Sequence, residues 1–127
     1  MEIMESTYTD YNAAIQAGAV GEGKALPELL PESAKDIRKS FDIDTNEVRL
    51  FFHFNAKNLS SIEKKCEEIL HSEVVLPNRR TSKWWPKNLT KPHQHKLSQD
   101  ISYLFFYCID GSNMTIDTKN NTAYYWK

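Results

Sequence analysis

The 127-residue sequence lacks the features that mark membrane proteins and proteins with an export signal. No stretch approaches 18 consecutive apolar residues, so no membrane contact through a spanning helix is expected. The first five residues, Met1–Glu5, are acidic and include neither a basic region nor an apolar run, so no secretory signal is recognisable. We therefore expect a cytoplasmic protein, with a removed export signal as the alternative.

Cysteine is scarce, since Cys66 and Cys108 are the only two. We interpret them as small core residues, Cys66 on a helix and Cys108 on a central strand. A disulfide between them is the alternative, and it would require an oxidising compartment. Because a chain of this length buries roughly two-thirds of its unfolded surface, residues 1–127 are expected to fold as one domain without a disulfide.

Motifs for catalysis and cofactor binding are also missing. There is no G-x-S-x-G sequence, and Gly21-Glu22-Gly23 lacks the third glycine of a phosphate-binding loop. The histidines and cysteines do not follow a zinc-binding spacing; they are His53, His71, His93, His95, Cys66 and Cys108. The sequence therefore predicts no catalytic residue, no metal and no cofactor, and it favours a protein that is not an enzyme.

The segment Asp42-Ile43-Asp44-Thr45-Asn46 has alternating oxygen ligands that could suit calcium. An EF-hand loop would need glycine at its sixth position and a bidentate glutamate at its twelfth, where this chain has Glu47 and His53. The favoured interpretation is a turn whose Asp and Asn side chains bind their own backbone amides.

The last quarter of the chain predicts three antiparallel strands joined by short turns. Ser102–Ile109 is almost entirely apolar, which is typical of a central strand covered on both faces. Asp110-Gly111 tolerates positive φ and leads into Met114–Asp117, and Thr122–Trp126 returns after a polar turn. Ala123 and Tyr125 should lie on one face of this last strand, and Tyr124 and Trp126 on the other.

A second pair of strands is predicted nearer the start of the chain. A strand from Arg38 to Ile43 should turn and return as Glu47–Phe54, with Val48, Leu50, Phe52 and Phe54 on one face. Together with the last three strands, this hairpin predicts a sheet of five antiparallel strands.

Helices are predicted on either side of the hairpin. The apolar positions between Leu59 and Leu70 follow a 3.6-residue period, which indicates one long amphipathic helix from Asn58 or Ser60 to Leu70. A short helix is expected over Asp10–Ala17 with Thr9 as its N-cap, and single helical turns over Leu26–Leu30 and Ala34–Ile37. The first eight residues are an edge strand or a disordered lead. The predicted fold class is α+β, with the five-strand meander packed against the long helix.

Charge is distributed unevenly along the chain. Residues 1–76 contain 8 Lys and Arg against 14 Asp and Glu, whereas residues 77–127 contain 8 against 3. The stretch from 79 to 96 combines cations with Trp84-Trp85-Pro86 and contains no carboxylate, and residues 78–99 show no apolar periodicity. A loop of this length in a small domain is usually functional or mobile. The candidate binding residues are Arg79, Arg80, Lys83, Trp84, Trp85 and Lys87.

Four short segments occur in an order that is typical of one family. They are Pro31–Ile37, Asp42–Asn46, Trp84–Pro86 and Ala123–Trp126. In this order they resemble a family of small, functionally uncharacterised bacterial proteins, some of which are labelled by similarity to the head domain of YbbD. The resemblance runs from about Tyr8 onward and implies an α+β domain from a bacterium or a phage. It assigns no catalytic residue, and the export signal that many members carry is not recognisable here.

These observations predict a small non-enzymatic binding protein of an accessory or inhibitor type, such as a toxin-immunity or counter-defence protein. Its partner would be a protein with an acidic surface, with the tryptophans as buried anchors. The first alternative is a nucleic-acid-binding module that uses residues 79–96 for phosphate contacts and base stacking. A small hydrolase or ligand-binding domain without a recognisable motif is a further alternative. The remaining alternative is purely structural: both tryptophans cover the open side of the sheet, and the lysines beside them are only solvated.

Overall fold

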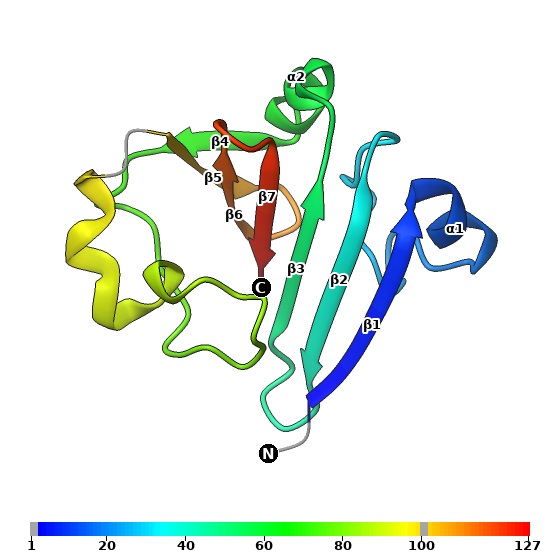
Figure 1. Cartoon of the computed structure of the whole chain (residues 1–127), viewed down its shortest axis with the longest axis horizontal. Helices are drawn as coiled ribbons and strands as arrows, with labels where there is room; N and C mark the ends of the chain where they lie inside the picture. Colours follow the sequence, from blue (N-terminus) through cyan, green and yellow to red (C-terminus); the bar gives the residue numbers. More distant parts are fainter. Residues whose placement is uncertain (1–2, 100–101) are drawn as a thin grey trace.

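The computed structural model describes residues 3–99 and 102–127, and its main element is a single sheet of seven antiparallel strands (Figure 1). The order across the sheet is β1-β2-β3-β7-β6-β5-β4. The strands are β1 (Ile3–Asp10), β2 (Lys35–Asp42), β3 (Val48–His53), β4 (Cys66–Ile69), β5 (Tyr103–Cys108), β6 (Asn113–Asp117) and β7 (Thr122–Trp126). The predicted fold class is therefore wrong, because β1 and β4 extend the sheet and no long helix packs against it within the described residues.

The three strands at the end of the chain form as the sequence predicts. β5 pairs with β6 and β6 with β7, and Gly111 has a φ of +85° in the turn between the first two. The strand β7 also pairs with β3, so that Arg49 lies opposite Trp126 and Phe51 opposite Tyr124. The last strand thus occupies the middle of the sheet and joins the two predicted groups of strands.

The hairpin of β2 and β3 is confirmed, and its turn has the predicted hydrogen bond. The amide of Asp44 donates to Oδ1 of Asp42 over 2.9 Å, and Asn46 adopts a φ of +62°. The helical turn predicted over Ala34–Ile37 is wrong, because β2 already begins at Lys35. Its register shifts between Lys35 and Arg38, where Asp36 has a φ of +51°.

The long helix predicted up to Leu70 is wrong. A 3-10 helix, η1 (Ala56–Asn58), leads into α2 (Leu59–Glu63), and the chain then becomes the edge strand β4. Cys66 lies directly opposite Cys108 of β5, and the two form a disulfide, so the interpretation as unpaired core thiols is also wrong. Pairing with β5 gives this segment backbone partners and a covalent link that a surface helix would not provide. The helical periodicity of the sequence could predict neither this pairing nor the disulfide, because both depend on a distant strand.

At the start of the chain, β1 forms the other edge of the sheet. Of the two alternatives for the first eight residues, the edge strand is therefore correct for residues 3–8. Residues 1–2 lie outside the described part. The helix α1 (Tyr11–Gln16) follows, and its N-cap is Asp10 rather than Thr9, because Oδ1 of Asp10 accepts from the amide of Ala13 over 2.8 Å. Ala14 of this helix is buried, whereas Ile15 is 45% exposed. Leu26–Leu30 forms no helix, although its leucines enter the core.

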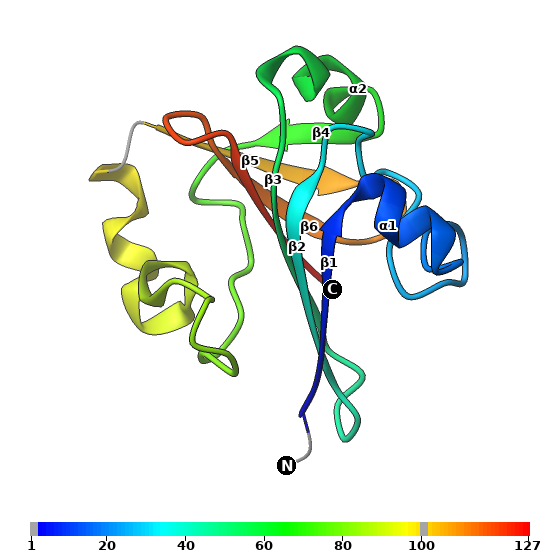
Figure 2. The same cartoon turned by 45° about the vertical axis from the view of Figure 1, so that its right-hand side comes forward.

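The sheet has two covered faces (Figure 2). The leucine face is covered by α1, α2 and the loop to residue 34, which contributes Leu26, Leu29 and Leu30. Its sheet residues are Ile37, Leu50, Phe52, Phe106, Cys108, Met114, Ile116, Ala123 and Tyr125. The tryptophan face is covered by residues 74–99, and its sheet residues include Arg49, Phe51, Phe105, Thr115, Tyr124 and Trp126. This arrangement confirms the predicted faces of β3 and β7.

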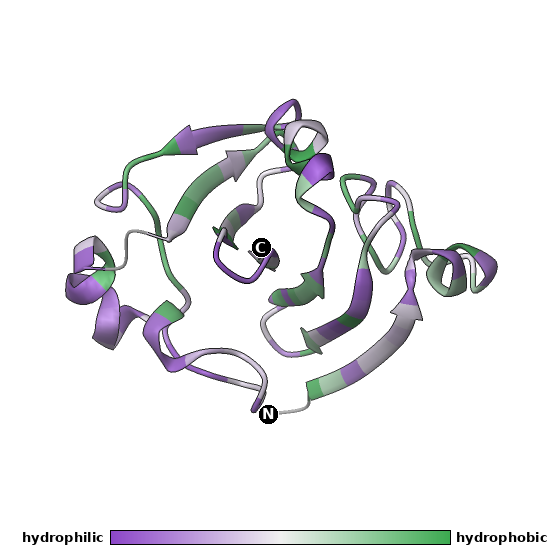
Figure 3. Cartoon of the chain, turned by 45° about the horizontal axis from the view of Figure 1, so that its top comes forward, coloured by the Kyte–Doolittle hydropathy of each residue, from purple (hydrophilic) through white to green (hydrophobic). Residues whose placement is uncertain are grey.

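Residues 74–99 contain little regular structure. Two 3-10 helices, η2 (Lys87–Leu89) and η3 (Lys91–Gln99), lie within them, and residues 74–76 form no strand. Figure 3 shows that hydrophilic residues predominate along this part of the chain. Across residues 3–99 and 102–127, the helices are all too short or too polar to cross a membrane.

Candidate functional site

The basic-aromatic segment, residues 74–99, is anchored to the sheet by Trp85. This side chain is fully buried, and its ring packs edge-on against Tyr124 and Trp126 with centroids 5.7 and 5.9 Å away. Its Nε1 donates to the carbonyl of Leu89 over 3.0 Å, so the polar atom of the indole is satisfied. Burial raises the pKa of the adjoining Tyr124 to about 12, with the nearby Tyr103 and Asp117 as smaller causes.

A buried arginine provides a second anchor. Arg49 is 3% exposed, and its guanidinium lies 5.5 Å from the centre of the Trp85 ring. Nη1 donates to the carbonyl of Arg79 over 2.6 Å, and Nη2 to Oε2 of Glu47 over 3.4 Å. Burial lowers the pKa of Arg49, while Glu47 opposes this shift. An arginine keeps its charge in such an environment, so the strand holds the loop backbone through a charged hydrogen bond.

Further side-chain hydrogen bonds fasten the start and the middle of the segment. Trp126 Nε1 donates to the carbonyl of Val75 over 2.8 Å, and Asn88 Nδ2 donates to the hydroxyl of Tyr103 over 2.9 Å. Near the other edge of the sheet, the hydroxyl of Ser82 donates to Oε1 of Glu5 on β1 over 2.6 Å. The segment is therefore attached to β1, β3, β5 and β7.

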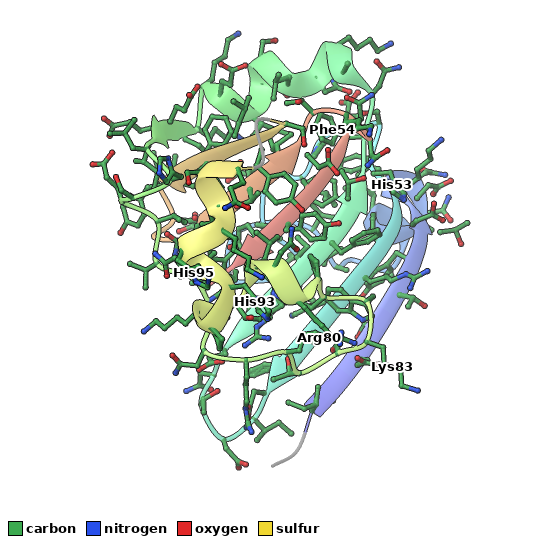
Figure 4. All side chains as sticks on the ribbon, turned by 60° about the vertical axis from the view of Figure 1, so that its left-hand side comes forward. His53, Phe54, Arg80, Lys83, His93 and His95 are labelled. Carbon is green, nitrogen blue, oxygen red and sulfur yellow. A yellow bond between two sulfur atoms is a disulfide. The ribbon has the colours of Figure 1, made fainter. Side chains whose placement is uncertain are left out.

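These anchors leave a basic surface hollow of about 470 Å³ on the outside of the segment. It is lined by Asn78, Arg79, Arg80, Lys87, Thr90, Pro92 and His93, with no carboxylate among them. In Figure 4, Arg80 lies between His93 and Lys83, and Arg80 Nη2 donates to the carbonyl of Lys83 over 3.2 Å. The hollow and the adjoining Lys83 thus form one positively charged surface, which we call the basic surface.

The six predicted binding residues divide into two groups. Arg79, Arg80 and Lys87 line the basic hollow, and the exposed Lys83 lies beside it. Trp85 lies in the core, and Trp84 is half-buried between Trp85 and Phe51, with ring centroids 6.2 Å from each. The cations therefore face outward while the aromatic rings face the sheet.

Some residues of this site were not predicted. Thr90 and His93 complete the hollow, and their sequence context gave no signal beyond the positive charge around them. Arg49 could have been found, because it alternates with Val48 and Leu50 on a strand whose other face is apolar. An arginine at such a position needs a partner when the second face is covered.

The described residues form no metal site around the histidines. His53 shares a hydrogen bond of 2.8 Å with the hydroxyl of Thr122 through Nδ1, and both cysteines are held in the disulfide. Within residues 3–99 and 102–127, no three His, Cys, Asp or Glu side chains are grouped so that they could hold a metal ion.

Comparison with known proteins gives one match. The family model of the YbbD head domain matches residues 2–53. This part of the chain resembles the YbbD head domain. The match confirms the predicted resemblance for the part from β1 to β3, and the Trp84–Pro86 and Ala123–Trp126 segments lie outside it. No match was found among curated proteins or among solved structures.

Proposed function

We propose that the protein is a non-enzymatic binding domain that uses its basic surface to hold a protein partner with an acidic surface. The observation that carries this proposal is the fixed, carboxylate-free cluster of Arg79, Arg80, Lys83 and Lys87 above a buried aromatic layer. Because the backbone below these cations is bonded to the sheet, the loop loses little conformational entropy when a partner binds. The cations would steer the encounter and contact the carboxylates of the partner.

The placement of the tryptophans favours a protein over single-stranded nucleic acid. Modules that bind single strands stack the bases on exposed aromatic rings beside a basic groove. Here Trp85 is fully buried and Trp84 is packed against Phe51, so neither offers a free ring face comparable to such platforms. Nucleic acid remains the second candidate because the hollow itself is rich in cations.

The proposal is tested by capturing a partner with three forms of the protein. The first is wild type, and the second carries Arg79, Arg80, Lys83 and Lys87 changed to glutamate. The third is a control with the same change of charge at exposed lysines outside the hollow: Lys35, Lys57, Lys64 and Lys119. Each form is incubated with lysate, with and without nuclease, and any captured protein is purified and titrated against all three.

We expect a nuclease-resistant partner that binds wild type and the control but not the second form. At four contacts, the loss should exceed about tenfold in dissociation constant, which corresponds to about 1.4 kcal/mol. Capture that disappears with nuclease would instead support the nucleic-acid module. Equal affinity of the second form and the control would contradict any role of the basic surface.

The accessory or inhibitor class, with toxin immunity and counter-defence as its examples, is part of the same proposal and is supported by the small domain and its concentrated positive charge. The Cys66–Cys108 disulfide supports an oxidising compartment rather than the cytoplasm expected from the sequence. Alkylation of free thiols in intact cells, before and after reduction, would decide between the two locations.

A further inference from the structure

A second cavity, of about 800 Å³, opens on the leucine face, on the other side of the sheet from the basic surface. It lies between the loop of residues 21–29, the strands β2 and β3, the turn after β5 and the end of β7. Its buried or half-buried apolar lining comes from Leu29, Val48 and Tyr125. A cavity of this volume is within the range of small-molecule sites, which are roughly 300–1,000 Å³ and mostly apolar.

Lysines are the most frequent charged residues of this cavity. Lys24, Lys39, Lys65 and Lys127 line it, against the carboxylates of Glu22, Glu28 and Asp110. In the described part of the chain, no carboxylate lies within ion-pair distance of any of these four ammonium groups.

The most buried of the carboxylates is already engaged within the protein. Asp110 accepts hydrogen bonds from the amide and the hydroxyl of Ser112, and from the hydroxyl of Tyr125 over 2.8 Å. Its oxygens are thereby directed at their own turn and at β7. The charge of Lys127 already acts on Asp110, which leaves Lys24, Lys39 and Lys65 to attract an anion from outside.

Among these lysines, Lys39 has the strongest physical reason to bind an anion, because it is half-buried and has no ion-pair partner among the described residues. It is half-buried on β2 beside Leu50, and its ammonium lies 5.8 Å from the centre of the Phe41 ring. Burial lowers the pKa of Lys39, and no carboxylate in the described part of the chain offsets this loss of hydration. A ligand carboxylate would restore a partner to this charge in surroundings that are partly shielded from water.

We propose that this cavity binds a small organic carboxylate with an apolar body, such as an aliphatic or aromatic acid. The carboxylate would be held by Lys39 with Lys65 or Lys24, and the apolar body would lie against Leu29 and Tyr125. This site is independent of the proposed function, because it lies on the opposite face and shares no lining residue with the basic surface.

Decanoate is a suitable probe, with decanol and decyltrimethylammonium as neutral and cationic matches of the same chain length. We expect calorimetric titration of the intact protein to show decanoate binding at least about tenfold tighter than either match. In NMR spectra, the amides that decanoate shifts should include those of residues 21–29. Shifts confined to other parts of the chain, or a dissociation constant for decanoate above about 1 mM, would overturn the proposal.

Two variants separate the charge from the cavity. Lys39→Gln should weaken decanoate binding by about tenfold, whereas Lys119→Gln, on the exposed turn after β6 and outside the cavity, should not change it. Ala25→Trp keeps every charge and places a large ring at an exposed lining position, so binding should fall while the thermal unfolding temperature is kept. Equal affinities of Lys39→Gln and Lys119→Gln, or an unaffected Ala25→Trp, would contradict it.

Discussion

The two faces of the sheet are covered by different means. On the leucine face, the cover from α1 to residue 34 is held together by its own backbone hydrogen bonds, such as Tyr11 to Ala34 and Leu26 to Ala19, and it packs on the sheet through alanines and leucines. On the tryptophan face, Arg49 and Trp126 of the sheet donate to carbonyls of the cover. An irregular segment leaves backbone groups unpaired, and here the sheet supplies partners for them.

This difference has a consequence for function. Apolar contacts are non-directional, so the position of the leucine cover is set mainly by the packing of its side chains against the sheet. The tryptophan cover is fixed by directional bonds to residues such as Arg79 and Val75, so the side chains on its outer side are held in defined places. The positively charged surface therefore depends on the buried layer beneath it.

The largest loss of stability is expected when the central anchor of the tryptophan face, Trp85, is removed. Trp85→Ala should lower the free energy of unfolding by about 3–5 kcal/mol, because it leaves a cavity and an unpaired carbonyl at Leu89. Trp84→Ala should have a smaller effect, since that ring is only half-buried. Urea denaturation followed by circular dichroism measures both, and equal losses would show that Trp85 has no special role as an anchor.

The matching substitution on the leucine face is Leu26→Ala. We expect a loss of about 2–5 kcal/mol in urea denaturation, because Leu26 is fully buried. Affinity for a partner of the basic surface should stay unchanged, whereas Trp85→Ala should lower it. Ile15→Ala, at a position that is 45% exposed, is the control and should remain within about 0.5 kcal/mol of wild type. Weaker partner binding by Leu26→Ala would show that the faces are coupled.

The Cys66–Cys108 disulfide packs on the leucine face but closes the chain segment that forms the tryptophan cover, since the chain between the two cysteines includes all of residues 74–99. Replacing both cysteines by alanine should lower the free energy of unfolding by about 2–4 kcal/mol, because the unfolded chain regains the freedom of this loop. Dithiothreitol should destabilise wild type similarly and leave the double variant unchanged. A variant that still responds to dithiothreitol would refute this account.

A smaller loss is expected from Arg49→Met, which keeps the bulk of the side chain but removes the charged hydrogen bond to Arg79. Denaturation should show a loss of about 1.5–3 kcal/mol, as is typical of hydrogen bonds to charged groups. Arg38→Met is the control, because Arg38 is exposed on the same face over the Phe51 ring, and its loss should stay below about 1 kcal/mol. The order of the two losses should not reverse.

The smallest effect concerns the pH dependence of the leucine face. Burial by itself would raise the pKa of Asp110, but hydrogen bonds from Ser112 and Tyr125, together with the charge of Lys127, lower it overall. Asp110 therefore stabilises the fold above the unfolded pKa of an aspartate, and this contribution is lost as the pH falls from there through the lower pKa of the folded state. Asp110→Asn should flatten the acid side of the stability profile. An identical slope in both proteins would contradict the shift.

The sequence predicted best where the pattern is local and repetitive. The alternation in β3 and β7 identified the correct faces, and Asp42 with Asn46 identified the turn between β2 and β3. The prediction of a long helix failed because an apolar spacing of 3.6 residues from Leu59 to Leu70 does not exclude a strand at one end of this segment. Cys66 then paired with β5, which lies far along the chain.

The candidate site was predictable only in part. The cluster of cations from Arg79 to Lys87 is visible in the sequence, and the structure places them outward around a common hollow. The burial of Trp85 depends on contacts with Tyr124 and Trp126, which lie about forty residues further along the chain, so no local pattern predicts it. The cavity with Lys39 combines six separate parts of the chain, and no local sequence pattern predicts it.

By itself, the sequence determined the strands of both hairpins, their alternating faces and the positive charge of the segment that follows Pro77, since these depend on neighbours in the chain. Tertiary structure decided the order of the seven strands, the formation of a strand rather than a helix at Cys66–Ile69, and the direction in which each tryptophan points. The physical reason is that these outcomes depend on which distant backbone and side-chain groups can satisfy one another once the chain is folded.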